Sequence, residues 1–331
     1  MTFFEADMSN GRLISQVLML YYLEDKNQAQ IAKLLNLSTS KVNRLLKQAR
    51  EQGWVEISIR TPFSKVLDLE QQLQSTYGIP EAFIIPSVTT EPTAAVQTLG
   101  RAAADYLLQR LRDGDTICIS GGKSVHAMVE AIETKRRYRV RVVPATGARR
   151  GKLFTDVNYL AAKLAERLGG EAYQLNAPVF VDTTEEREAL LSMRHISEVL
   201  AMAREAQIAV VGIGSIVPME SSYFDLLATT LPDPQDWGRM ISEVDGHGEI
   251  FAYVFDGQGQ LCLPQYNERV VGLGLDELKN IPLSIGVAAT SEKARPLQGA
   301  LRGGYFNTLI TDEMTAQDVL KLHHSRTAQR P

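Results

Sequence analysis

The stretch NQAQIAKLLNLSTSKVNRLLKQAREQGWVEISIR, residues 27–60, decides how the chain is interpreted. Ile31, Leu34 and Leu35 follow the i, i+3, i+4 spacing that is typical of the buried face of a helix. The same spacing recurs one segment later in Val42, Leu45 and Leu46. The stretch therefore predicts two short amphipathic helices in succession.

A tight turn is expected between these helices, and a strand after them. Asn36-Leu37-Ser38 supplies the turn, and Ser38 is a natural N-cap for the second helix. Residues 54–60 alternate strictly between apolar and polar side chains, which indicates a half-buried strand. Two helices, a turn and a strand in this order predict a winged helix-turn-helix, whose second helix enters the major groove of DNA.

Positive charge gathers in this stretch, although the chain as a whole carries a net charge of −4. Five basic residues and no acidic residue lie between Lys33 and Arg50, and such local charge suits contact with phosphates. If the second helix begins after Ser38, arginine and lysine can meet guanine edges or phosphates and asparagine can meet adenine. The candidate DNA-binding residues are Ser38, Thr39, Ser40, Lys41, Asn43, Arg44 and Lys47. An ordinary helical hairpin with a solvated basic face is the alternative.

Length and composition indicate an intracellular protein of two or three domains. The chain has 331 residues, of which 44% are hydrophobic, so it can bury a sizeable core. Only two cysteines occur, both within apolar runs, which fits a reducing compartment without a disulfide framework. The apolar patch 17–23 is too short to span a bilayer, and no signal-peptide layout is present. We expect a cytoplasmic protein without a membrane partner.

The remaining sequence predicts three parts. Residues 1–61 form the winged helix-turn-helix, with a preceding helix over 9–24. Residues 62–80 form a linker or dimerisation helix, because Val66, Leu69 and Leu73 recur at heptad-like spacing. Residues 81–331 form an effector domain. In the last part, strand and helix signals alternate, which predicts an α/β fold with a doubly wound, mostly parallel sheet. The expected strands are 82–86, 116–120, 139–143, 179–181, 208–211, 250–255, 269–272, 284–288 and 307–311. The expected helices are 94–111, 125–132, 157–168, 197–205 and 293–302, and the tail 323–331 is expected to fray.

A glycine-rich segment, Ser120-Gly121-Gly122-Lys123-Ser124, stands between a predicted strand and a predicted helix. Glycines allow the backbone to wrap around an anion, and the amides at a helix N-terminus point towards it. Lys123 and the Ser124 hydroxyl add donors. The segment lacks the upstream glycine of a Walker A motif. An anion site and a plain strand-to-helix turn with a capping serine remain even alternatives from the residues alone.

Together these features resemble the sorbitol-operon (SorC-type) family of bacterial sugar regulators, over nearly the whole chain. The family's N-terminal pattern is matched by Gln28, Ile31, Ala32, Leu35, Ser38, Val42, Arg44, Leu45, Leu46, Ala49, Gly53 and Val55. Thr39 and Asn43 depart from it, standing where the family usually has Arg and Ser, so the operator sequence is not carried over. The resemblance adds Gln28 to the DNA-binding candidates. It also implies a tetramer and an effector domain similar in fold to sugar-phosphate isomerases and deaminases.

The resemblance further implies where a phosphorylated sugar would bind. In that family the loop equivalent to 120–124 holds the phosphate, a lysine at the place of Lys293 serves the effector, and a carboxylate at the place of Glu249 accepts hydroxyl hydrogen bonds. Lys293 also begins a predicted helix, which is unfavourable unless an anion is near, whereas an exposed loop lysine is the alternative. In 243–249, EVDGHGE, His247 is expected to be a loop residue rather than a base. Further candidates are Gly147, Asp156 and Asn158, with Arg149 and Arg150 as unassigned extra charges.

These observations favour a DNA-binding transcriptional regulator, taken as a repressor of a carbohydrate or polyol operon. Its partners would be operator DNA, a phosphorylated sugar or polyol effector, and further copies of the chain in a dimer or tetramer. We expect no cofactor, no metal site and no catalytic residue. A sugar-phosphate isomerase or deaminase with an appended helical domain is the alternative, and a sugar-phosphate sensor that contacts other proteins is a third.

Overall fold

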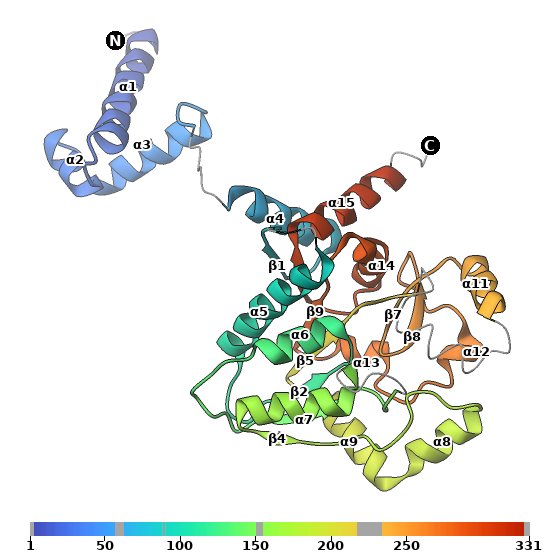
Figure 1. Cartoon of the computed structure of the whole chain (residues 1–331). Helices are drawn as coiled ribbons and strands as arrows, with labels where there is room; N and C mark the ends of the chain where they lie inside the picture. Colours follow the sequence, from blue (N-terminus) through green and yellow to red (C-terminus); the bar gives the residue numbers. More distant parts are fainter. Residues whose placement is uncertain are drawn as a thin grey trace. The chain divides into compact units, whose positions relative to one another are not determined.

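A computed structural model describes residues 3–56, 63–87, 89, 91–149, 155–216 and 234–327. The chain divides into two compact units, Met1–Ser64 and Lys65–Pro331, and each unit is described by itself. Figure 1 shows the helical first unit in blue and the α/β second unit in the remaining colours. None of the helices in the described part of the chain combines the length and the apolar character needed to cross a membrane.

The first unit is a helix-turn-helix behind a long N-terminal helix. Its elements are α1 (Phe3–Leu18), a π-helical turn η1 (Met19–Leu23), α2 (Gln28–Leu34) and α3 (Thr39–Glu51). The sequence placed the first helix at 9–24, whereas α1 begins earlier and its end widens into the π-helical turn. Ile14, Val17, Ile31, Val42 and Leu45 are buried together and fix the three helices to one another. The predicted helix-turn-helix is thereby confirmed.

Two details of this unit differ from the predicted pattern. Leu34 is 59% exposed, because it ends a helix of seven residues and faces away from the core, and Ala32 is buried in its place. Of the predicted wing strand 54–60, residues 57–60 lie outside the described part of the chain. Trp54, Val55 and Glu56 form no strand. The wing therefore stays a prediction.

The second unit is built on a seven-stranded sheet in which every paired neighbour is parallel. The order across the sheet is β1 (Glu81–Ile85), β10 (Thr308–Asp312), β9 (Leu283–Val287), β5 (Ile208–Gly212), β2 (Thr116–Ile119), β3 (Arg141–Pro144) and β4 (Glu171–Ala172). The chain proceeds outwards from β2 through β3 to β4 and then returns to β5 beside β2. The predicted parallel α/β sheet is confirmed, and its topological switch point lies between β2 and β5.

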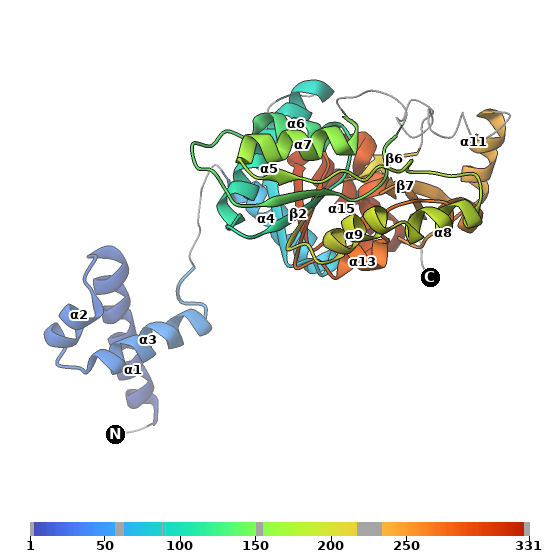
Figure 2. The ribbon, with the colours of Figure 1, turned by 90° about the horizontal axis from the view of Figure 1, so that it is seen from below.

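Helices cover both faces of this sheet (Figures 1 and 2). Alternate side chains of one strand point to opposite faces, so Ile117 and Ile119 join one core and Cys118 the other. The first face is covered by α5 (Pro92–Arg110), α6 (Lys123–Ala131) and α7 (Val157–Leu168). The second face carries α4 (Ser64–Tyr77), α9 (Arg194–Arg204), α13 (Leu275–Lys279), α14 (Ala294–Gly303) and α15 (Glu313–Thr327).

Helix α4 belongs to the core of the second unit. Its apolar stripe of Val66, Leu69 and Leu73, expected as a linker or dimer contact, is buried against the second face of the sheet within the same chain. The helix also lies along the outer edge of β1, where the Ile84 N–H donates to the Glu70 carboxylate at 2.8 Å. Burial is the main cause that raises the pKa of Glu70.

A small antiparallel sheet of β6 (Gly214–Ser215), β7 (Gly246–Ile250) and β8 (Tyr253–Asp256) stands beside the large one. The prediction of one strand over 250–255 is wrong, because Phe251 and Ala252 turn the chain with φ of 56° and 69°. Predicted strands 179–181 and 269–272 are isolated bridges. The predicted fraying of 323–331 is contradicted as far as Thr327, where α15 ends. The remaining elements are α8 (Thr184–Ser192), α11 (Pro234–Glu243), α12 (Pro264–Asn267) and the 3-10 turn η3 (Ser291–Lys293).

Close approach of α5 and α6 generates a stability prediction. A Cβ added at Gly100 would lie 2.5 Å from the carbonyl carbon of Ala127, a backbone atom that cannot rotate away. We expect Gly100→Ala to force the two helices apart and to lower the free energy of unfolding by about 1–3 kcal/mol, measured by urea denaturation. Arg101→Ala, an exposed change on the same helix, is the control. Equal stability of the Gly100→Ala chain and the wild type would contradict this packing.

Candidate functional site

The exposed side of α3 carries the predicted DNA-binding side chains. Thr39, Ser40, Lys41, Asn43, Arg44 and Lys47 are all exposed. Ser38 is the N-cap, and its hydroxyl accepts the Lys41 N–H at 3.2 Å. Gln28 is the first residue of α2 and is partly buried, next to a capping box formed by Asn27 and Gln30. The caps define where both helices begin, and therefore which side chains α3 presents.

The predicted anion loop lies at the switch point of the large sheet. In such sheets ligands bind outside the carboxyl ends of the strands at this point. Ser120 follows β2 and is buried; its hydroxyl accepts the Gly212 N–H at 2.9 Å and donates to the Gly121 carbonyl at 3.0 Å. This hydroxyl joins the ends of β2 and β5, so we expect Ser120 to position the loop rather than to contact a ligand.

Two glycines shape the loop for different reasons. Gly122 has a φ of 115°, a conformation that side chains rarely adopt, and its N–H donates to the Thr155 carbonyl at 3.1 Å. A Cβ at Gly121 would lie 2.6 Å from the same carbonyl. Thr155, which the sequence did not single out, therefore holds the loop against the start of α7.

The described residues leave donors unused at the beginning of α6. Its N-cap is Gly122, which has no side chain to satisfy the first amides of the helix. Among the described residues, none forms a hydrogen bond or ion pair with the side chains of Lys123 and Ser124. Free amides, a hydroxyl and an ammonium group at a helix N-terminus form an anion-binding arrangement.

Lys293 brings a second cation to the same place from the other side of the switch point. It is the last residue of η3 and the N-cap of α14, another helix start without a side-chain cap. Burial lowers the pKa of Lys293 from its ordinary value of 10.5; the carboxylates of Glu292 and Glu249 oppose the change, and the charge of Lys123 adds to it. The charges of Glu292, Glu249 and Lys123 thus all act on Lys293.

Glu249 is positioned by the hairpin between β7 and β8. Its carboxylate accepts the Ala252 N–H at 3.0 Å. The two central residues of the hairpin, Phe251 and Ala252, are both left-handed and both buried, as in a type I′ turn made without the usual Asn-Gly pair. Such backbone strain persists only where the surroundings enforce it. One Glu249 oxygen is used by this turn, and the other can accept from a ligand.

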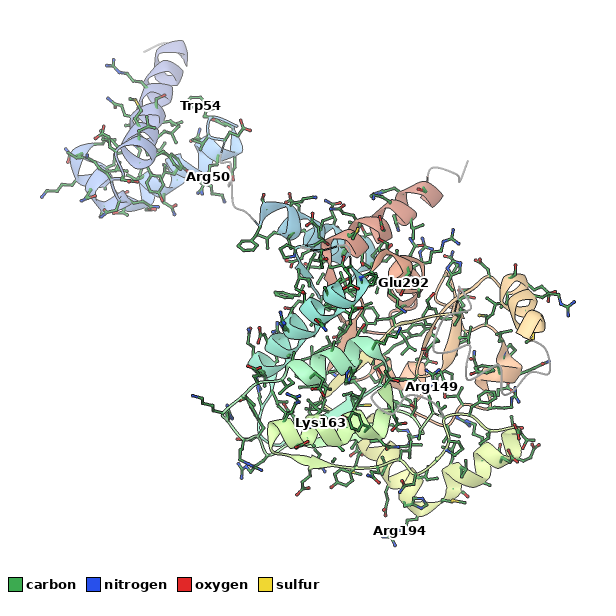
Figure 3. All side chains as sticks on the ribbon, viewed as in Figure 1. Arg50, Trp54, Arg149, Lys163, Arg194 and Glu292 are labelled. Atoms are coloured by element: carbon green, nitrogen blue, oxygen red, sulfur yellow. The ribbon has the colours of Figure 1, made fainter. Side chains whose placement is uncertain are left out.

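The three weaker candidates, Asp156, Asn158 and Gly147, form hydrogen bonds or close packing contacts within the protein. Asp156 caps α7 by accepting the N–H groups of Asn158 and Tyr159. Asn158 exchanges two hydrogen bonds with the backbone of Leu175. A Cβ at Gly147 would lie 2.5 Å from the carbonyl oxygen of Ala177, so this glycine allows two segments to pack. As ligand contacts, all three stay predictions. Arg149, labelled in Figure 3, lies on the connection from β3 to α7, and Arg150 falls outside the described residues.

The segment 243–249 does not form the loop that was expected. His247 lies within β7 at a β-bulge, and its Nε2 is 3.1 Å from the Asp245 carboxylate. Asp245 itself has a φ of 51°. No group of three His, Cys, Asp or Glu side chains that could hold a metal ion occurs in the part of the chain that the structure describes.

Comparison with protein families accounts for both units. Residues 61–321 match the family described as "Putative sugar-binding domain". Residues 15–52, which include α2 and α3, match the family described as "Sigma-70, region 4". The first match covers most of the chain.

Two curated relatives are similar over nearly their whole length. The deoxyribonucleoside regulator of Bacillus subtilis (strain 168) is 30% identical over 94% of this chain and 98% of its own. The sorbitol operon regulator of Klebsiella pneumoniae is 31% identical over 94% and 98%. The crystal structure of the latter, the full-length regulator SorC, aligns with a TM-score of 0.72 and 29% identity, covering 93% of this chain and 98% of that one.

The position of Lys293 predicts a stability gain on its removal. Because the folded protein disfavours the charged form, Lys293→Met should raise the free energy of unfolding of the ligand-free protein at neutral pH by about 1 kcal/mol. At pH values between the lowered pKa of Lys293 and 10.5, the unfolded chain binds more protons than the folded protein, so wild-type stability rises with pH. The difference in stability between Lys293→Met and the wild type therefore narrows over this range. Thermal unfolding across this range measures both effects, with exposed Arg295→Met on α14 as the control. A less stable Lys293→Met protein would contradict the assignment.

Proposed function

Because the chain belongs to the SorC-type family of sugar-binding transcriptional regulators, we propose that it binds operator DNA through α3 and a phosphorylated sugar or polyol at the switch point of its sheet. The observation that carries the proposal is the meeting of Lys123 and Lys293 at two helix starts that lack side-chain caps. We further propose that the protein is cytoplasmic, that it represses a carbohydrate or polyol operon, and that it acts as a dimer or tetramer.

The chemistry of the switch point supports a phosphate group rather than a neutral ligand there. Two ammonium groups face the carboxylates of Glu249 and Glu292, and the uncapped amides of α6 add positive potential beyond that balance. A phosphate dianion would remove this imbalance and would raise the lowered pKa of Lys293. The free oxygen of Glu249 would accept a hydrogen bond from a sugar hydroxyl. In this proposal phosphate supplies the affinity, and the carboxylate orients the sugar.

Helix α14 offers a direct route from this site to α4. Lys293 stands at the start of α14, and Gln298, one turn later, is buried. The Gln298 amide donates to the hydroxyl of Tyr77, the last residue of α4, at 3.3 Å and to the Val319 carbonyl at 3.4 Å. The Tyr77 hydroxyl donates to the same carbonyl. A shift of α14 on effector binding would therefore move α4, the first helix of the second unit.

Regulation would follow from linkage. An effector that binds one arrangement of the chain better than another changes the affinity for the operator, and the operator changes the affinity for the effector by the same factor. The coupling free energy is typically about 1–3 kcal/mol. Two-fold pairing with the half-sites of an operator requires at least two copies. The isomerase or deaminase alternative is not favoured, because the curated relatives described above are regulators.

Arg44→Ala tests the DNA-binding assignment. Arg44 is exposed on α3, and loss of an arginine contact to a base or phosphate typically costs about 1–3 kcal/mol. We expect operator affinity to fall by that amount, measured by fluorescence anisotropy on a fragment that the full chain selects from random DNA. Lys26→Ala removes an equal charge where the lysine pairs with Glu24 and is the control. Wild-type affinity of the Arg44→Ala protein would show that α3 is misassigned.

Tyr77→Phe tests the route through α14. It removes only the hydroxyl that joins Gln298 to α4, so we expect sugar phosphates to bind as in the wild type while their effect on operator affinity shrinks by roughly tenfold. Lys293→Met should instead abolish sugar-phosphate binding and leave operator binding by the free protein intact. Calorimetry measures sugar-phosphate binding, and fluorescence anisotropy measures operator affinity with and without the sugar phosphate. Tyr106→Phe, the same change at a buried tyrosine on α5, is the control. Unchanged coupling in Tyr77→Phe would rule out this route.

A further inference from the structure

A cavity opens at the carboxyl end of the same sheet, two strands away from the switch point. It has a volume of about 320 Å³ and lies where β1 and β10 end, at Ile85 and Asp312. The first turns of α5 and the turn after β9 complete its wall. In the order of the sheet, β9 and β5 separate these strands from β2 and its anion loop. The position is that of a ligand site in an α/β sheet.

The cavity is distinct from the switch-point site, although one turn borders both. Thr290, Ser291 and Glu292 line the cavity, whereas the next residue, Lys293, is under the influence of Lys123 and Glu249. Lys293, Lys123 and Glu249 are not among the described residues that line the cavity. Glu292 is labelled in Figure 3 and marks this turn.

Thr290 is held in the cavity wall in an unfavourable state. Its φ is 85°, which is strained for a β-branched residue, and its N–H donates to the Asp312 carboxylate at 2.9 Å. Its hydroxyl oxygen is buried and forms no hydrogen bond with any residue that the structure describes. A buried hydroxyl without a partner is costly. Rotation of the Thr290 side chain towards the cavity, which this residue lines, would let a ligand hydroxyl supply the missing hydrogen bond.

The other lining groups restrict the chemistry of such a ligand. Glu292 and Asp312 are acidic, and no lysine, arginine or histidine occurs among the described lining residues, so a phosphate or carboxylate would be repelled. Asp312 is already saturated, because it accepts hydrogen bonds from Ser87, Thr290 and Thr315. The Glu292 carboxylate is exposed and forms no hydrogen bond with a described residue. Ile85, Pro86 and Met314 add apolar surface.

We infer that this cavity is a separate binding site for an uncharged polyhydroxylated molecule of the size of a free monosaccharide or polyol. The Thr290 hydroxyl and the Glu292 carboxylate exchange hydrogen bonds with its hydroxyl groups, and the apolar wall packs against its carbon skeleton. The inference does not depend on the proposed effector, because no group of the switch-point site takes part. A ligand here would contact the turn that ends in Lys293.

The test uses thermal unfolding and calorimetry of the full chain with sorbitol, ribose and glucose, in the presence of saturating inorganic phosphate. We expect at least one of these compounds to raise the melting temperature of the wild type beyond the phosphate effect. Thr290→Val should weaken its binding by up to about tenfold, and Ala95→Phe, which fills the cavity, should abolish it. Thr76→Val on α4 makes the same chemical change elsewhere and is the control.

A second measurement keeps the inference testable if a variant fails to fold. In a Cys262→Ser background, the thiol of Ala95→Cys faces the cavity and should react with N-ethylmaleimide, and the bound sugar should slow that reaction. The inference is overturned if none of the three compounds binds, if phosphate competes with their binding, or if Thr290→Val and the thiol reaction are unaffected. Failure of phosphate itself to bind would instead count against the proposed effector and leave this cavity's result interpretable.

Discussion

The candidate site of the second unit depends on the burial of Lys293 at the switch point, where burial lowers its pKa and the charge of Lys123 adds to that effect. Each lysine stands at the start of a helix, where the helix dipole adds positive potential and no side chain caps the amides. The parallel sheet makes this arrangement possible, because β2 and β9, with β5 between them, deliver both connections to one edge. Ser120, Gly122 and Thr155 then hold the loop in shape without using its outward donors.

Much of this fold could be predicted from periodicity, because buried strands and amphipathic helices leave strong local patterns. Strands β1, β2, β3, β5, β9 and β10 and helices such as α7 follow such patterns closely. The hairpin of β7 and β8 could not be predicted, since its turn is formed by Phe251 and Ala252 and lacks a turn-forming sequence. Leu34 shows a second limit of prediction from periodicity. Ile31, Leu34 and Leu35 follow helical spacing, but Leu34 is exposed at the end of a helix of only seven residues.

The charged residues of the candidate site could be predicted from the sequence. The residues whose role depends on tertiary packing could not. Lys123, Glu249 and Lys293 stand out in the sequence, and the structure brings their charges together. Asp156 and Asn158 have the same polar character but cap a helix and fasten a loop. Gly147 allows two backbone segments to approach closely. Gln298 gives no signal in the sequence, because an ordinary glutamine acquires its role only when α4, α14 and α15 meet.

The hydrogen bond from Ile84 to Glu70 has a consequence for how copies of this protein can associate. An open strand edge is a template on which a foreign strand can add, and it is a common start of uncontrolled aggregation. At one border of the large sheet, α4 places a partly buried carboxylate against the outward N–H of Ile84. At the other border, β4 has only two residues. Both borders of the sheet therefore offer a foreign strand little edge on which to add.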